Sequence, residues 1–582
     1  MLSEAMLFNM GITNRMGRIE DGTTVSDYDK GEIERQISLK VSLLNGEWQS
    51  HHLNILDTPG YTDFIAEAKA ALRVADASIT VVDGVAGIEI GTERVWNFAA
   101  EYKLPRLLLI NKMDRADVDP EQVLEMARER FGRQVVPLQF PVAPGEGFHQ
   151  LVDLVEMKLL TYKDGKAEVG EIPSDVQDEA QAAYEQLVEA IAETDEELME
   201  KYFSDGELSP EDLKAGLRKA IIQLDLFPAY FSDAYNNVGI DNLMDGLIHF
   251  GPSPAESAGL SFSTEKEEEV VLEASEGSSL AALVFKTIAE QHVGELSLLR
   301  LYAGSLKPGD EVFNSSKNSN ERIGQFFHLN GHQRTEEESA AAGDIVALVK
   351  LKNTHTGDTL CSKGNQVKLP GIEFPEPLIS VAIAPKEKGG EDRMATGLAQ
   401  LHEEDPSFIF KYDGEIHQSL LFAQGELHLG TILQRLQERF NAEIATETPR
   451  IPYRETIRGN AEGHYRHKKQ TGGRGQFGEV FLRVAARPRG EGFEFGSAVV
   501  GGNIPSNFIP AIEKGIVEAL PEGLPGVQLG YLERLLQVLH RQRPGLRRQV
   551  APPLRHLAHG QRRQGLRTPL REPRVQQARL RH

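Results

Sequence analysis

Residues 53–60, LNILDTPG, decide the fold of this 582-residue chain, because a short apolar run there ends in an acidic side chain and a turn. The same pattern, an apolar run that ends in a polar side chain, recurs at 78–83 (SITVVD) and at 106–111 (RLLLIN). Two segments with helical spacing, 63–75 and 89–102, separate the three runs. Short apolar strands that alternate with helices of this length predict βαβ units around a buried parallel sheet.

The polar residues after the first run are suited to a nucleotide. Parallel sheets bind ligands at the carboxyl ends of their strands, and 57–60 (DTPG) follows such an end. The carboxylate of Asp57 can hold a magnesium-bound water, and Gly60 lets its backbone N–H approach a terminal phosphate.

The motif 111–114 (NKMD) has the chemistry to recognise guanine. The carboxylate of Asp114 can accept hydrogen bonds from the ring N–H and the exocyclic amine of guanine. The amide of Asn111 can meet the other edge of the base, and the stem of Lys112 can lie along the ring. Adenine lacks this pair of donors, so the site selects against it. Either tetrapeptide is common by chance, but the two in this order at strand ends predict a guanine-nucleotide site.

Beyond the first domain, the composition of the chain changes several times. Acidic helical spacing, a Pro/Ser-rich stretch, and β-rich runs punctuated by Gly and Asp mark these changes. We expect a first α/β domain (1–115 and 228–255) with a helical insert (116–227), a linker (256–279), a small β-barrel (280–370), an α+β domain (371–450), a partial α+β domain (451–527) and a basic tail (528–582). The segment 531–582 holds 13 Arg, two Glu and no Lys or Asp, and we expect the tail to be disordered or to be read in a shifted frame.

The composition is that of a soluble multidomain protein. Hydrophobic residues make up 40% of the chain and charged residues 26%, and no apolar run approaches the ~18 residues that span a bilayer. No signal peptide is evident at the start of the chain. A single cysteine, Cys361, excludes an internal disulfide and a multi-cysteine zinc site. We therefore expect a cytoplasmic protein without a membrane partner.

Seven further motifs carry a resemblance to a known family: 54–64, 83–87, 356–361, 373–377, 425–429, 453–457 and 471–478. With the two nucleotide motifs, they make the chain resemble elongation factor G and its paralogues among the translational GTPases, over roughly residues 2–525. The resemblance implies a P-loop-type GTPase domain with an insert, then a β-barrel and α+β domains. It also implies binding of GTP, GDP and Mg²⁺, and a monomer that acts on the ribosome (rRNA and the stalk protein) to move tRNA and mRNA.

The resemblance assigns roles to individual residues. Asp57 and Ser38 would serve the metal, while Gly60 and Tyr61 would act in catalysis. The nucleotide would be bound by Asp57, Thr58, Pro59, Gly60, Tyr61, Asn111, Lys112, Met113, Asp114, Ser232, Asp233 and Ala234. The backbone N–H of Ala234 would meet the guanine carbonyl, and Ser232 would compensate for Asp233, which replaces the family's Ser.

The chain departs from the family's pattern at the nucleotide. No G-x-x-x-x-G-K-[ST] loop is found in it, so we expect the chain to begin just past that loop, without the first strand, and to bind GTP weakly. Ser38 replaces the family's Thr and keeps the hydroxyl, while Gln36 replaces a Gly of the first switch. Tyr61 replaces the family's His, and a phenol cannot present a charged imidazolium, so we expect slower hydrolysis. The basic tail stands where the family has its final domain.

Two other hypotheses follow from these departures. The chain could be a ribosome-binding protein without useful GTPase activity, which would bind ribosomes equally with GDP, GTP or neither. It could also be the unstable product of a gene relic, which would not unfold cooperatively.

Overall fold

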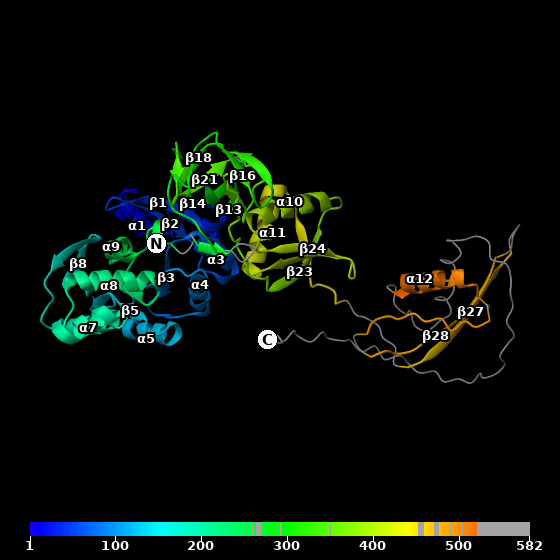
Figure 1. Ribbon diagram of the computed structural model, residues 1–582, viewed down its shortest axis with the longest axis horizontal. Helices are drawn as coiled ribbons and strands as arrows, with labels where there is room; N and C mark the ends of the chain where they lie inside the picture. Colours follow the sequence, from blue (N-terminus) through cyan, green and yellow to red (C-terminus); the bar gives the residue numbers. More distant parts are fainter. Residues whose placement is uncertain are drawn as a thin grey trace. The chain divides into compact units, whose positions relative to one another are not determined.

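The computed structural model describes residues 1–257, 261–263, 269–290, 294–349, 351–451, 459–470, 476–488, 491–501 and 504–520 (Figure 1). The chain divides into two compact units, one that ends at Pro449 and one that begins at Arg450. Among the described residues, no helix is both long and apolar enough to cross a membrane.

A four-stranded parallel sheet forms the centre of the first domain and confirms the predicted α/β fold. Its strands run in the order β3 (Ser78–Asp83), β4 (Arg106–Asn111), β10 (Phe227–Phe231) and β5 (Val135–Pro137). Side chains of β4 alternate between two cores, with Leu107 and Leu109 in one and Leu108 and Ile110 in the other. The helices of this domain are α1 (Leu2–Asn9), α2 (Lys30–Arg35), α3 (Ile65–Val74), α4 (Ile90–Glu101), α5 (Pro120–Phe131) and α9 (Ile240–Phe250).

One predicted strand lies outside the parallel sheet. The run that ends at Asp57 forms β2 (His51–Asp57), which pairs antiparallel with β1 (Ser42–Trp48) in a separate two-stranded sheet. Gln49 and Ser50 both have positive φ, 45° and 63°, as a two-residue type I′ hairpin turn requires. The expectation that this run belongs to the parallel sheet is wrong for the described residues, because the turn pairs it with the strand directly before it.

The insert expected to be helical also contains a sheet. It has the predicted helices α6 (Gln177–Ala192), α7 (Glu196–Asp205) and α8 (Pro210–Ile222). A four-stranded antiparallel sheet precedes them, formed by β6 (Gln139–Val142), β7 (Gln150–Asp153), β8 (Lys158–Lys163) and β9 (Lys166–Gly170). The Asp-Gly turn between β8 and β9 was the missed signal. In addition, α5 and β5 belong to the first domain, since β5 pairs with β10.

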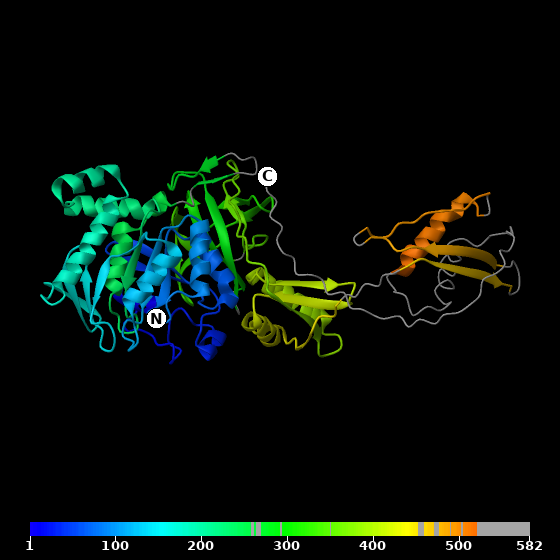
Figure 2. The ribbon, with the colours of Figure 1, turned by 90° about the horizontal axis from the view of Figure 1, so that it is seen from below.

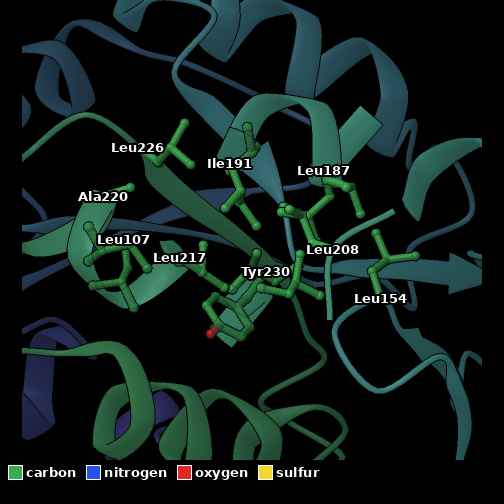
Figure 3. Packing of buried hydrophobic residues seen from close by; sticks show 14 of the residues in the cluster. Leu107, Leu154, Leu187, Ile191, Leu208, Leu217, Ala220, Leu226 and Tyr230 are labelled. Carbon is green, nitrogen blue, oxygen red and sulfur yellow. The ribbon is translucent and has the colours of Figure 1, made fainter. Parts of the chain in front are cut away.

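The insert packs on the parallel sheet through one hydrophobic cluster. Figure 3 shows Leu187 and Ile191 of α6 and Leu217 of α8 near Tyr230 of β10 and Leu107 of β4. These side chains are almost fully buried, so burial of apolar surface holds the insert to the first domain.

The next domain is β-rich, as predicted. Eight strands form one antiparallel sheet in the order β17-β16-β22-β13-β14-β21-β18-β19. Their bounds are β13 (Ala281–Glu290), β14 (Gly294–Ala303), β16 (Glu311–Asn314), β17 (Ser319–Arg322), β18 (Phe326–Asn330), β19 (Gln333–Glu337), β21 (Ile345–Val349) and β22 (Thr359–Cys361). Two short strands, β15 (Ser305–Leu306) and β20 (Ala340–Ala341), pair separately. The expected linker includes the paired strands β11 (Ser261–Ser263) and β12 (Glu269–Val271).

The α+β domain after it has four antiparallel strands and two helices. The strands lie in the order β24 (Ile409–Asp413), β25 (Gln418–Ala423), β23 (Ile379–Pro385) and β26 (Ile444–Glu447). The helices α10 (Glu391–Glu404) and α11 (Glu426–Phe440) share one core with the sheet, which includes Leu398, Leu421 and Leu436 (Figure 2, yellow-green).

The second unit holds the hairpin β27 (Ala461–Lys469) and β28 (Gln476–Val484), and the helix α12 (Ile509–Ala519). Val480 and Ile512 form the centre of its small core. The motif at 453–457, residues 471–475 of the Gly-rich motif and the basic tail at 528–582 lie outside the described residues.

Candidate nucleotide site

The structure brings the two predicted base-recognition loops together at the carboxyl ends of β4 and β10. Asn111 Oδ1 accepts hydrogen bonds from the backbone N–H of Ala234 at 2.9 Å and from the hydroxyl of Ser232 at 3.1 Å. The backbone N–H of Met113 donates to the carbonyl of Ser232 at 3.2 Å, and its side chain is fully buried in the core below. The loops are adjacent because their strands are neighbours in a parallel sheet.

Two residues of the loop 232–234 make hydrogen bonds within the protein. The N–H of Ala234, which we expect to meet a guanine carbonyl, lies at this edge of the sheet beside Asn111. Asp233 is buried and accepts hydrogen bonds from the backbone N–H groups of Tyr235 and Asn236, so it shapes its own loop. Burial raises the pKa of Asp233, and the charge of Asp114 acts in the same direction.

Lys112 connects the end of β4 to the end of β3. It has a left-handed backbone, with φ 64°, and its Nζ pairs with Asp83 Oδ2 at 2.7 Å. Partial burial acts to raise the pKa of Asp83, but the hydrogen bonds from Lys112 and from the N–H groups of Val85 and Ala86 outweigh it, so the pKa is lowered. Asp83 thereby holds the lysine stem at the edge of the base-recognition loops.

A second group of oxygen atoms lies at the end of β2. The hydroxyl of Ser3 donates to Asp57 Oδ2 at 2.7 Å, and the hydroxyl of Ser38 donates to Asp27 Oδ1 at 2.7 Å. Burial raises the pKa of Asp27, against the lowering effect of the hydrogen bond from Ser38, and the charge of Asp57 also acts to raise it. Mg²⁺ prefers a site with one or two carboxylates that leaves room for water and phosphate.

These residues fit a magnesium ion bound together with a nucleotide. Within the described part of the chain, no cluster of three or more His, Cys, Asp or Glu side chains forms a metal cage. Ser3 and Asp27 were missed by sequence reasoning. Their only signal is indirect: Ser3 lies in the first turn of α1, and Asp27 lies eleven residues before Ser38.

The residues directly after Ser38 are held by a buried carboxyl group, that of Glu32. Glu32 is 1% exposed and accepts hydrogen bonds from the N–H groups of Leu39 at 3.0 Å and Lys40 at 3.3 Å. Burial raises the pKa of Glu32 to about 7, against the opposing charge of Lys40. Gln36, at the position of the family's glycine, adopts a left-handed backbone with φ 56°. This conformation disfavours a residue with a Cβ, so the bend is retained at a cost.

The loop after Asp57 is an open part of the site. Tyr61 is 54% exposed, and Gly60 is also exposed. A Cβ added to Gly60 would meet nothing within 4 Å, so the surrounding protein leaves space beside its backbone. The short 3₁₀ turn Thr62–Phe64 follows at once and leads into α3.

Comparisons with known proteins identify the domains of this chain. The profile described as Elongation factor Tu GTP binding domain matches residues 1–253, and that of Elongation factor G domain 2 matches 279–363. The profiles of Elongation Factor G, domain III and Elongation factor G, domain IV match 374–448 and 449–528. Among solved structures, ttk003000868 from Thermus thermophilus is 32% identical, with a TM-score of 0.78. The match covers 90% of this chain and 76% of that one.

Proposed function

Because this chain belongs to the elongation factor G family of translational GTPases, we propose that it couples the binding and hydrolysis of GTP to the movement of tRNA and mRNA on the ribosome. The observation that carries this proposal is the order of the four family domains along one chain. The convergence of residues 111–114 and 232–234 at one edge of the parallel sheet supports it.

In this proposal, each group of the site has a task. Asn111 and Asp114 recognise guanine, with Lys112, Met113 and the loop 232–234 holding their geometry. Asp57 and Ser38, assisted by Asp27 and Ser3, present oxygen ligands for Mg²⁺, which when bound would neutralise phosphate charge.

The loop that carries Gly60 and Tyr61 serves the reacting end of the nucleotide in this proposal. The backbone of Thr58, Pro59 and Gly60 faces the terminal phosphate, and the exposed Tyr61 orients the attacking water. The protein then acts mainly by positioning and electrostatic stabilisation, as is usual for phosphoryl transfer.

Ribosomal partners complete the proposal. The cations Arg466, Lys468 and Lys469 on β27 suit rRNA phosphates, and the acidic insert suits the ribosomal stalk protein. The chain acts as a monomer in the cytoplasm, where ribosomes translate.

The test is GTP hydrolysis by the purified chain, with and without ribosomes, together with the Kd for GTP and GDP. The proposal expects hydrolysis that ribosomes accelerate and ribosome binding that depends on the nucleotide, and Asp57→Ala is the inactive control. Ribosome binding that is equal with GDP, GTP and no nucleotide would instead favour the non-catalytic hypothesis. The same Kd tests the weak GTP binding expected from the sequence.

Tyr61 gives the proposal a second test. An imidazole in its place can carry a positive charge, which a phenol cannot. Acid–base groups of this kind typically raise a reaction rate about 10²-fold or more. Tyr61→His should therefore raise the ribosome-stimulated rate at least about 10-fold, while Tyr61→Phe should not raise it. An equal or lower rate with His would show that Tyr61 does not limit hydrolysis.

A further inference from the structure

Asp63, two residues beyond Tyr61, contacts a helix of a different domain. Its Oδ2 accepts hydrogen bonds from the backbone N–H groups of Leu427 at 2.9 Å and His428 at 3.2 Å. These N–H groups belong to the first turn of α11, where a helix has no internal acceptors for them. The carboxylate therefore caps α11, although it lies more than 360 positions away in the sequence.

The structure leaves space for this contact by placing glycine at the N-cap of α11. A Cβ added to Gly425 would lie 2.3 Å from Asp63 Oδ2 and 2.6 Å from Oδ1. The backbone of Gly425 is extended, with φ −171°, so any residue could adopt it. Glycine is thus required here by the approach of Asp63 and not by backbone conformation.

The capped end of α11 is itself anchored in the core of its domain. His428 is 1% exposed; its Nε2–H donates to Asp405 Oδ2 at 2.8 Å, and its Nδ1 accepts the N–H of Gln424 at 3.2 Å. Burial acts to raise the pKa of Asp405, but the hydrogen bond from His428 holds it well below its usual range. The ring of Phe64 packs edge-on against His428, with centroids 5.9 Å apart. Asp63 is therefore attached to a buried, hydrogen-bonded part of that domain.

The segment that carries Ser38 is tied to the same surroundings. Arg35 donates a hydrogen bond to Gln434 of α11. The N–H of Val41 donates to Glu67 Oε2 at 2.9 Å, and the other oxygen of Glu67 pairs with the buried Lys286 of β13. The segment that carries Ser38 and the segment that carries Asp63 are thus both fastened to elements outside the nucleotide-binding domain.

We propose that Asp63 is a positioning residue for GTP hydrolysis: by capping α11 it ties the segment 58–64, with Gly60 and Tyr61, to the domain that contains α11. A displacement of that domain then displaces the segment that serves the terminal phosphate. The hydrolytic part of this proposal rests on the proposed function, whereas the tether itself does not.

Hydrogen–deuterium exchange of the full chain tests the tether. Asp63→Ala removes the cap, and Gly425→Ala expels the carboxylate while keeping its charge. Both should raise exchange at least about 10-fold in two places, residues 58–66 and residues 426–430. Asp63→Asn keeps an acceptor oxygen and should restore both segments to near the wild-type rate.

Asp195→Ala is the matched control, because Asp195 caps α7 with bonds of 2.9 and 3.3 Å to the N–H groups of Glu197 and Leu198. It should raise exchange only in the first turn of α7. The proposal is overturned if 58–66 exchanges at the wild-type rate in both Asp63→Ala and Gly425→Ala, whatever happens at 426–430, since Asp63 would then be only a helix cap.

Kinetics test the consequence for hydrolysis. Asp63→Ala and Gly425→Ala should lower ribosome-stimulated kcat at least about 10-fold with unchanged Kd for GDP, and Asp63→Asn should recover most of the rate. Unchanged kcat in both variants overturns the positioning role. If the wild-type chain hydrolyses no GTP, the proposed function fails, while the exchange rates still decide whether the tether exists.

Discussion

Single side chains at this site hold loop geometry as much as they contact a ligand. Asn111 binds the neighbouring loop, Asp83 binds Lys112, and Glu32 binds the amides after Ser38. These contacts hold the loops in place, and preorganised groups of this kind make electrostatic stabilisation effective.

Asp114→Asn should change the base that the site selects. Asparagine cannot accept hydrogen bonds from both the ring N–H and the amine of guanine. Its amide N–H₂ can instead donate a hydrogen bond to the C2 carbonyl of xanthine. Affinity for GDP should fall at least about 10²-fold, and xanthosine diphosphate should become the preferred ligand, because buried polar groups left unpaired are strongly rejected. Competition binding with the two nucleotides measures this, and unchanged guanine preference would remove Asp114 from the base site.

Glu32→Gln should remove a pH dependence of stability. Folding raises the pKa of Glu32 from 4.5 to about 7, so the folded chain binds the proton more tightly than the unfolded chain. Its contribution is fully present below pH ~4.5 and is lost as the pH rises through ~7, a change on the order of 3 kcal/mol. Urea unfolding at pH 5 and pH 7.5 should show a smaller loss between the two pH values for Glu32→Gln than for the wild type. Equal losses would contradict the shifted pKa.

At the scale of elements, tight turns decided which strands pair with each other. The apolar patterns of the strands did not decide this. The hairpins β1–β2 and β8–β9 both close with two residues of positive φ, and each joins strands that are neighbours in sequence. Such turns match the right-handed twist of the strands, so they override a general expectation of parallel or helical structure.

Gly165→Ala should weaken the β8–β9 hairpin. Gly165 has φ 73°, and its added Cβ would lie 2.7 Å from Asn237 Nδ2. We expect a loss of about 1–2 kcal/mol in the free energy of unfolding. Gly170→Ala at the end of β9 is the control, because its Cβ would meet nothing within 4 Å. Similar losses in the two variants would mean that backbone conformation is not the cause.

At the scale of the whole molecule, the nucleotide-binding domain is joined to its neighbours by charged side chains as well as apolar ones. Arg300 of β14 pairs with both oxygens of Asp76 at 2.8 Å, and Lys286 of β13 pairs with Glu67 of α3. Lys286 and Glu67 are 8% and 9% exposed, so each depends on the other for its charge to be tolerated.

Lys286→Met should destabilise this junction strongly. It leaves the buried carboxylate of Glu67 without its charged partner, with only the N–H of Val41 still bound, which costs about 3–5 kcal/mol. The exposed pair of Lys163 and Glu168, 66% and 62% exposed, provides the control, and Lys163→Met should cost less than about 1 kcal/mol. Urea unfolding of both variants measures the difference, and a small loss for Lys286→Met would show that the pair is solvated.

The sequence by itself determined the features that local patterns encode. Apolar runs predicted β3 and β4, helical spacing predicted α3 and α4, and the motifs at 57–60 and 111–114 predicted the family. These signals lie within a few residues of one another, so burial and turn chemistry suffice to reveal them.

The tertiary structure alone decided which distant side chains meet. Ser3 meets Asp57, which lies 54 positions away, and Asp63 reaches α11 across 364 positions, with no sequence pattern that links them. Such contacts form only when the packing of whole domains has offset the entropy of closing very long loops. For that reason the sequence indicated the nucleotide and its recognition motifs, whereas only the fold showed what holds the loops around it.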